Sequence, residues 1–203
     1  MADATDNQAP AATPRMKQRF EEEVLPRLSE AAGTRNRQAL PRLQKIVLTS
    51  GMGKHLDGTK VKAAVKEQVL SDLAKIAGQK AVAVAAKKSV ANFKVREGYE
   101  THARVTLRGD RMWEFYDRLV SLAIPRIKDF RGIKDKSFDG RGNFSFGLQE
   151  QGIFPEVDMT SAQHTFGMNV TLVWSNSTDE LSRSAMTGLG FPFVKKDEKR
   201  SAA

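Results

Sequence analysis

Residues 41–87 read PRLQKIVLTSGMGKHLDGTKVKAAVKEQVLSDLAKIAGQKAVAVAAK and carry the clearest structural pattern in the chain. Apolar residues recur there at helical spacing over residues 59–77, at Val61, Val65, Val69, Leu73 and Ile76. Gly78 is a typical residue just past a helix end. Strands are predicted on either side, at residues 42–48, where Gln44, Ile46 and Leu48 share one face, and at residues 82–87. A helix between two strands predicts a protein of mixed class.

The flanking segments extend this pattern in both directions. Further helices are predicted at residues 16–29, at residues 111–124 with Asp110 as the N-cap, and at residues 179–189 after Thr178. Further strands are predicted at residues 103–108, 144–148 and 166–173. The elements do not alternate strictly, which favours an α+β fold with a largely antiparallel sheet and helices packed on it. We expect one domain at residues 16–194, a disordered extension at 1–15 and a charged tail at 195–203.

Most aromatic residues near the middle of the chain are expected to lie in the core. The helix after Asp110 presents one apolar face, made of Met112, Phe115, Leu119 and Leu122. Trp113, Phe115 and Tyr116 stand at helical positions, where we expect them in the core and not as a platform for nucleic-acid bases. In residues 126–134, Ile127 and Phe130 are expected to anchor a basic loop.

The net charge of +9, with 33 basic and 24 acidic side chains and a pI near 9.9, predicts a polyanionic partner. The charge is unevenly distributed. Residues 31–56 contain five basic side chains and no acidic one, and residues 80–141 contain fifteen basic and eight acidic ones. Residues 142–194 are net acidic. One molecule is therefore expected to present two unlike faces.

Several functional classes are excluded by what the chain lacks. Without cysteine there can be no disulfide, thiolate metal site or cysteine nucleophile. His55, His102 and His164 have no metal-ligand spacing, and the turn at residues 51–54 lacks the pattern of a phosphate loop. No apolar run approaches the roughly 20 residues that span a membrane, and the N-terminus has no targeting pattern. We therefore predict a cytoplasmic protein with no cofactor, no metal, no membrane contact and no enzymatic activity.

Residues 87–96, KKSVANFKVR, have the composition of a loop that contacts RNA. Lysine and arginine neutralise phosphates, serine and asparagine bond to sugar or phosphate oxygens, and Phe93 could stack on a base. The alternative is a solvated basic loop in which Phe93 is buried over the core. Composition alone leaves both interpretations open.

Eight strings in one order give the chain a resemblance to a known family. They are GQK at 78–80, KSVANFK at 88–94, VTLRGDRMW at 105–113, PRIKDFRG at 125–132, KSFDGRGN at 136–143, QEQ at 149–151, IFPE at 153–156 and GFPF at 190–193. Over residues 16–194 the chain resembles the bacterial form of the large-subunit ribosomal protein five family.

This resemblance implies a structural constituent of the large ribosomal subunit in its central protuberance. Such a protein binds 5S rRNA, helps to attach it to 23S rRNA, contacts peptidyl-site tRNA and neighbouring protuberance proteins, and bridges to a basic protein of the small-subunit head, ribosomal protein thirteen. The implied 5S rRNA contacts are Thr49, Gln79 and Thr106. The implied tRNA-facing loop contains Lys87, Lys88, Ser89, Asn92, Phe93, Lys94 and Arg96. The implied bridge residues are Arg131, Lys134, Asp139, Arg141 and Asn143.

The chain departs from the family's usual residues at several of these places. Thr49 stands where asparagine is usual, and Ala81 replaces a proline. Val84 and Ala85 replace a threonine and a basic residue, and Glu100, Thr101 and His102 replace a Pro-Ile-Gly string. Two other functions share the charge argument: a free-standing RNA-binding or chaperone protein, and an RNA-modifying enzyme. The enzyme would need a cofactor cradle or a polar catalytic cluster, and the sequence has neither.

Overall fold

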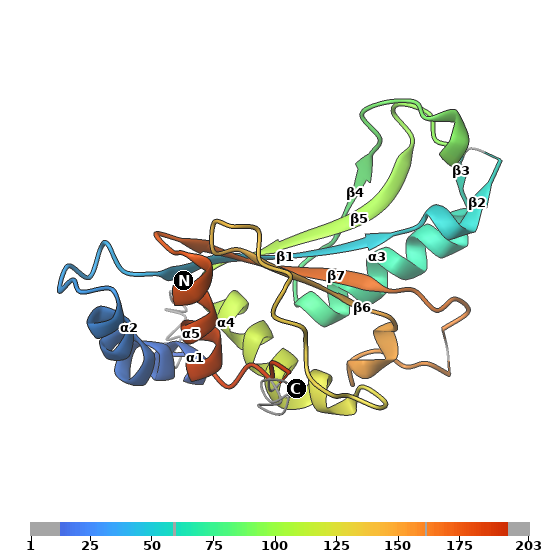
Figure 1. Ribbon diagram of the computed structural model, residues 1–203. Coiled ribbons are helices and arrows are strands. Elements are labelled where there is room, and N and C mark those ends of the chain that lie inside the picture. Colours follow the sequence, from blue (N-terminus) through green and yellow to red (C-terminus); the bar gives the residue numbers. More distant parts are fainter. Residues whose placement is uncertain (1–12, 59, 161, 195–203) are drawn as a thin grey trace, which may run out of the picture.

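The computed structural model describes residues 13–58, 60–160 and 162–194 (Figure 1). Its main sheet has five antiparallel strands in the order β4-β5-β1-β7-β6. The strands are β1 (Arg42–Gly51), β4 (Val82–Ala85), β5 (Glu100–Leu107), β6 (Phe144–Leu148) and β7 (Met168–Ser175). A short hairpin of β2 (Leu56–Asp57) and β3 (Lys60–Val61) forms a second sheet. The predicted antiparallel sheet is confirmed.

Helices occupy the predicted places, and π-helical and 3-10 turns extend some of them or lie in the loops between strands. They are α1 (Arg15–Arg19), α2 (Leu25–Ala31), α3 (Ala63–Ala77), α4 (Gly109–Arg118) and α5 (Asp179–Gly188). Phe20–Val24 and Leu119–Ala123 are π-helical, and Gly53–His55, Ala91–Phe93, Ile124–Arg126 and Gln151–Ile153 are 3-10 turns. Thr178 caps α5 as predicted, because its side chain accepts a hydrogen bond from the Leu181 N–H at 3.4 Å.

The core lies under one face of the sheet. Alternate residues of β1 and β5, such as Ile46, Leu48 and Leu107, are fully buried, and Figure 1 shows α3 and α4 on this side. Trp113, Phe115 and Tyr116 are buried in this core, as predicted. The partly buried Ile127 and Phe130 pack against it. The opposite face of the central strands is left open by these two helices (Figure 1).

The start of α3 and the orientation of Gln44 differ from the predictions, because the backbone departs from regular geometry at both places. α3 begins at Ala63 and not at residue 59, since Gly58 adopts a φ of 64° and the chain turns into the β2–β3 hairpin, which takes Val61 as a strand residue. Gln44 is exposed, because an irregularity in the β1–β7 pairing between Leu43 and Lys45 turns Leu43 inward instead.

Two expectations for the α4 region are also wrong. Leu122 is 49% exposed, because the π-helical turn adds a residue to the repeat and Ala123 takes the buried position. Asp110 is not the N-cap, since α4 begins at Gly109. Its carboxylate lies in the first turn, 3.0 Å from the Lys17 ammonium. The predicted extension and tail fall mostly on residues 1–12 and 195–203, outside the described residues.

Candidate nucleic-acid interface

The open face of the sheet brings together two of the three predicted 5S rRNA contacts. Thr49 on β1 pairs with Arg104 on β5 and with Asn169 on β7. In the next row, Val47 pairs with Thr106 and Thr171. Directly paired residues project from the same side of a sheet. Thr49 and Thr106 therefore lie on one face, in neighbouring rows.

The side chains of this face suit a polyanion. We define the open face by the residues of β1, β5, β6 and β7 that project from the same side of the sheet as Thr49 and Thr106. They are Lys45, Val47, Thr49, Arg104, Thr106, Ser145, Gly147, Asn169, Thr171 and Val173. None of these ten residues is acidic. Hydroxyl and amide groups can bond to ribose and phosphate oxygens, while Lys45 and Arg104 can neutralise phosphates.

Gln79 joins this face from the turn after α3. Gly78 ends the helix in the left-handed conformation, with a φ of 65°, and the next residue lies against β5. There the Gln79 Nε2 donates to the Thr106 carbonyl oxygen at 3.3 Å. The three predicted contacts are thus neighbours, although one amide donor of Gln79 is already engaged with the backbone.

Sequence reasoning missed Lys45, Arg104, Asn169 and Thr171 as members of this face. The alternation in residues 103–108 does place Arg104 on the same side as Thr106, so this signal was present. The sequence contains no comparable signal for Asn169, because its position beside Thr49 depends on the register between two strands far apart in the chain.

The predicted tRNA-facing loop is a well-formed hairpin tip. The Val90 and Val95 N–H groups each donate to the other residue's carbonyl oxygen, at 2.9 and 3.1 Å. The Ser89 Oγ accepts a hydrogen bond from the Glu97 N–H at 2.9 Å, and Lys94 adopts a left-handed φ of 54°. In Figure 1 the tip stands at the top, beyond the strands of the sheet and beside β3. Ser89 therefore shapes the tip through its hydroxyl.

The side chains of this tip point into solvent. Phe93 is 72% exposed, so the alternative in which it is buried over the core is wrong. Lys87, Lys88, Asn92, Lys94 and Arg96 are exposed as well. An exposed aromatic ring among four cations can stack on a base while the cations neutralise nearby phosphates.

The predicted bridge residues divide into two groups. The Asp139 carboxylate accepts hydrogen bonds from the Arg141 N–H at 2.9 Å, the Asn143 N–H at 3.0 Å and the Asn143 amide at 2.7 Å. These bonds, the Asn143 amide above all, hold the pKa of Asp139 below its ordinary value. Asn143 also accepts from the Trp174 N–H at 3.0 Å. Asp139 and Asn143 therefore shape the loop, while Arg131, Lys134 and Arg141 are exposed.

The two glycines of this loop form a turn and not a ligand cradle. Their N–H groups are occupied by a carboxylate of the chain itself: Gly140 donates to one oxygen of Asp179 at 3.1 Å, and Gly142 donates to the other at 2.7 Å. Asp179 is the first residue of α5, so these bonds attach the turn to the start of that helix.

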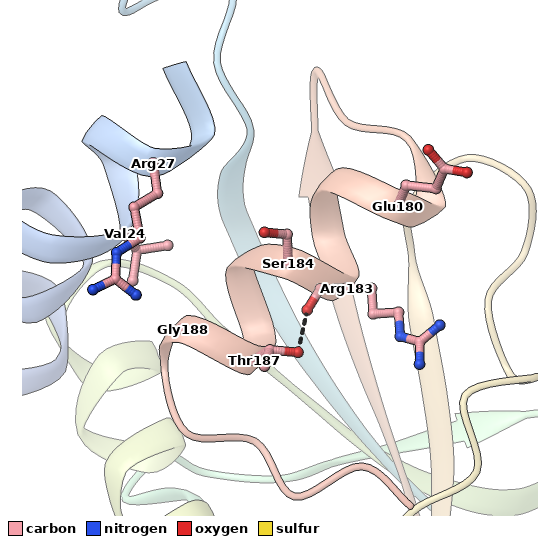
Figure 2. Close-up of a pocket in the computed structure, with 7 residues that line it drawn as sticks. All are labelled: Val24, Arg27, Glu180, Arg183, Ser184, Thr187 and Gly188. Carbon is pink, nitrogen blue, oxygen red and sulfur yellow. Dashed lines mark hydrogen bonds between the residues drawn. The ribbon is translucent and has the colours of Figure 1, made fainter. Parts of the chain in front are cut away.

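A cleft of about 500 Å³ lies between α5 and the N-terminal helices (Figure 2). Figure 2 shows that the guanidinium groups of Arg27 and Arg183 point to opposite sides and do not converge. Arg183 is also paired with Asp135 at 3.0 Å. Within the described ranges, no three potential metal-ligating side chains cluster, and no helix is long and apolar enough to cross a membrane.

The chain is similar to known proteins over most of its length. Residues 36–96 match the family model described as ribosomal protein L5, and residues 100–193 match the model of the C-terminus of the same ribosomal family. The large ribosomal subunit protein uL5 of Kocuria rhizophila is 48% identical over 181 residues, which cover 89% of this chain and 94% of the relative. The protein of the same name from Sulfurovum sp. is 49% identical over 181 residues, covering 89% and 97%. That from Acidobacterium capsulatum is 46% identical over 179 residues, covering 88% and 96%.

Proposed function

The chain belongs to the ribosomal protein L5 family, and from this premise we propose that it anchors 5S rRNA in the large ribosomal subunit. It is a structural constituent of the large subunit in cytoplasmic ribosomes and not an enzyme. We propose in addition that the protein recognises 5S rRNA through the shape and charge of a rigid surface.

The observation that supports this most strongly is the open face of the sheet. It carries two cations and several hydroxyl and amide groups with no carboxylate, and it contains Thr49 and Thr106, with Gln79 bonded at its border. A flat polar face of this kind can follow an RNA backbone and bond to 2′-hydroxyl groups. We assign 5S rRNA to this face.

Two other contacts belong to the same proposal. The tip at residues 87–96 faces peptidyl-site tRNA, with Phe93 and its surrounding cations. The loop at residues 131–143, with Arg131, Lys134, Asp139, Arg141 and Asn143, meets the small-subunit head protein, ribosomal protein thirteen. The net acidic charge of residues 142–194 suits such a basic partner. Attachment of 5S rRNA to 23S rRNA and contacts with neighbouring protuberance proteins complete the assembly.

A binding titration of the purified protein against 5S rRNA, with bulk tRNA as competitor, tests the central claim. Thr106→Ala and Gln79→Ala should each weaken binding by about 1 kcal/mol, the net contribution of a hydrogen bond. Thr187→Ala is the matched control, because the Thr187 hydroxyl bonds to the Arg183 carbonyl oxygen on α5. If both variants bind as tightly as this control, the assigned face is wrong.

Co-sedimentation separates this role from that of a free RNA chaperone. A ribosomal constituent should remain with large subunits through a salt wash, whereas a chaperone should be released. Loss of the protein from washed subunits would contradict the proposal.

A further inference from the structure

A polar cavity of about 610 Å³ opens at the end of the open face, where β1, β6 and β7 come together. Thr49 and Asn169 belong both to its wall and to the open face. The other lining residues come from the ends of β1 and β6, the start of β7 and the segments next to them: Gly51, Lys54, Leu148, Gln149, Glu150, Thr165, Phe166, Gly167 and Met168. This volume is in the range of small-ligand sites in proteins.

The polar side chains of this cavity have no partners within the described part of the chain. Thr49, Lys54, Gln149, Glu150, Thr165 and Asn169 all line it, and none of them makes a side-chain hydrogen bond or ion pair there. The contrast with Asp139 is clear, since its carboxylate accepts three hydrogen bonds within its own turn. These six residues with uncommitted polar side chains line one space, and Gln149 and Glu150 also border a neighbouring hollow beside Phe130 and Met159. Together they form a surface suited to an external polar ligand.

The shape of the cavity depends on two glycines. A Cβ at Gly167 would lie 2.8 Å from the Leu148 carbonyl oxygen, so β7 can begin this close to the end of β6 only with glycine. Gly51, which also lines the cavity, places no side chain in it. Neither glycine therefore fills the cavity with a side chain.

The mixture of charges selects the kind of ligand. Lys54 favours RNA, but the Glu150 carboxylate would repel a phosphate. A base has N–H donors that a carboxylate can accept, and the amides of Gln149 and Asn169 can both donate and accept. Guanine fits this set best, because its N1–H and N2–H groups are adjacent and can reach both oxygens of one carboxylate.

We propose that this cavity receives one unpaired guanine of the bound RNA, with its Watson–Crick edge toward Glu150. The inference rests on the proposed function, since the base would belong to 5S rRNA lying on the open face. Single-stranded bases in loops and bulges are commonly recognised by such edge contacts.

Chemical probing of 5S rRNA with kethoxal, which reacts with guanine N1 and N2, tests the inference. At saturating protein, one unpaired guanine should become protected. Glu150→Gln should restore its reactivity and lower affinity about tenfold, because the amide offers N–H groups where the base also donates. Asn169→Ala should lower affinity several-fold and weaken the same protection.

Two controls separate this inference from the proposed function. Glu180→Gln removes an exposed carboxylate in the first turn of α5 and should change neither affinity nor protection. Thr106→Ala should weaken binding, yet keep the guanine protected at saturation. If 5S rRNA binds and no guanine protection depends on Glu150, the cavity assignment is overturned and the proposed function stands. If 5S rRNA does not bind, both fall.

Discussion

At the scale of single residues, Asp139 shows how one carboxylate can organise a loop. It accepts three hydrogen bonds from Arg141 and Asn143, and the pKa of Asp139 is lowered as a result. A depressed pKa in the folded state means that the charged form stabilises the fold. This contribution is present above the unfolded pKa of about 3.9 and is lost as pH falls through the lower folded value.

Asp139→Asn should therefore destabilise the protein more at pH 7 than at pH 3, because part of the charge-dependent contribution is lost below the unfolded pKa. Thermal unfolding of both proteins at the two pH values measures this difference. Glu30→Gln changes an exposed carboxylate elsewhere and should show no such dependence. An equal difference at pH 7 and pH 3 would falsify the charge-based explanation.

Gly132 has a conformation and a position that only glycine can fill. Its φ is 100°, and a Cβ there would lie 2.7 Å from the Val194 backbone nitrogen. The neighbouring Ile133 N–H donates to the Pro192 carbonyl oxygen at 2.9 Å, which holds the loop against the C-terminal segment. Close packing between two backbones therefore determines where the predicted bridge loop lies.

Gly132→Ala should lower the free energy of unfolding by about 1–3 kcal/mol, through backbone strain and steric conflict together. Gly33→Ala provides the comparison, because Gly33 has a φ of 63° and a Cβ added there would meet nothing within 4 Å. Denaturant titration of the two variants should show the larger loss for Gly132. Equal losses would mean that strain alone acts.

At the scale of elements, two π-helical turns keep apolar residues that are four positions apart on the buried side of their helices. Met16, Phe20, Val24 and Leu28 are all buried, although steps of four residues overshoot the 3.6-residue turn of an α-helix. The wider turn at Phe20–Val24 absorbs this overshoot. The turn at Leu119–Ala123 acts in the same way and leaves Leu122 in solvent.

The β4–β5 hairpin is expected to act separately from the open face. β4 is an edge strand, and the tip at residues 87–96 stands beyond the strands of the main sheet (Figure 1). Replacing Lys88 and Lys94 with alanine should impair tRNA positioning in the peptidyl site and leave 5S rRNA affinity within about twofold. Filter binding and tRNA footprinting on reconstituted subunits measure the two effects, and equal losses would mean that the loop is misassigned.

Phe93→Ala refines this test. Because Phe93 is 72% exposed, its loss should change the free energy of unfolding by less than about 0.5 kcal/mol. Reduced tRNA contact without loss of stability would identify stacking as its role. A clearly destabilised variant would instead indicate that the ring supports the fold.

At the scale of the whole molecule, cations divide into paired and unpaired groups. Those of the first helix are neutralised within the fold: Arg15 lies 2.5 Å from Asp117, Lys17 lies 3.0 Å from Asp110 and Arg19 lies 3.1 Å from Glu23. Lys45 and Arg104 on the open face have no such ion pair in the described ranges. Lys45, Arg104 and the cations of the hairpin tip are therefore available to a polyanionic partner.

Affinity for 5S rRNA should consequently fall steeply with salt, by at least about tenfold between 50 and 200 mM, as counterions are released. Lys45→Ala and Arg104→Ala should each reduce the slope of log affinity against log salt by roughly one. Arg15→Ala, which removes an internally paired cation, should leave the slope unchanged. A flat salt dependence in the unmodified protein would contradict phosphate recognition by this face.

The class of fold, the order of most elements, the burial of most residues on the predicted apolar faces and the anionic nature of the partner all followed from the chain alone. These properties depend on local periodicity and net charge, which neighbouring residues carry. Other features could be seen only in the tertiary structure. Gln44 lies at the surface, and Arg104, Thr49 and Asn169 lie side by side on three strands. Asp139 and Asn143 form a hydrogen bond with each other within their own loop. Strand register and hydrogen-bond partners arise from contacts between residues distant in sequence, so no local pattern encodes which polar groups remain free to bind RNA.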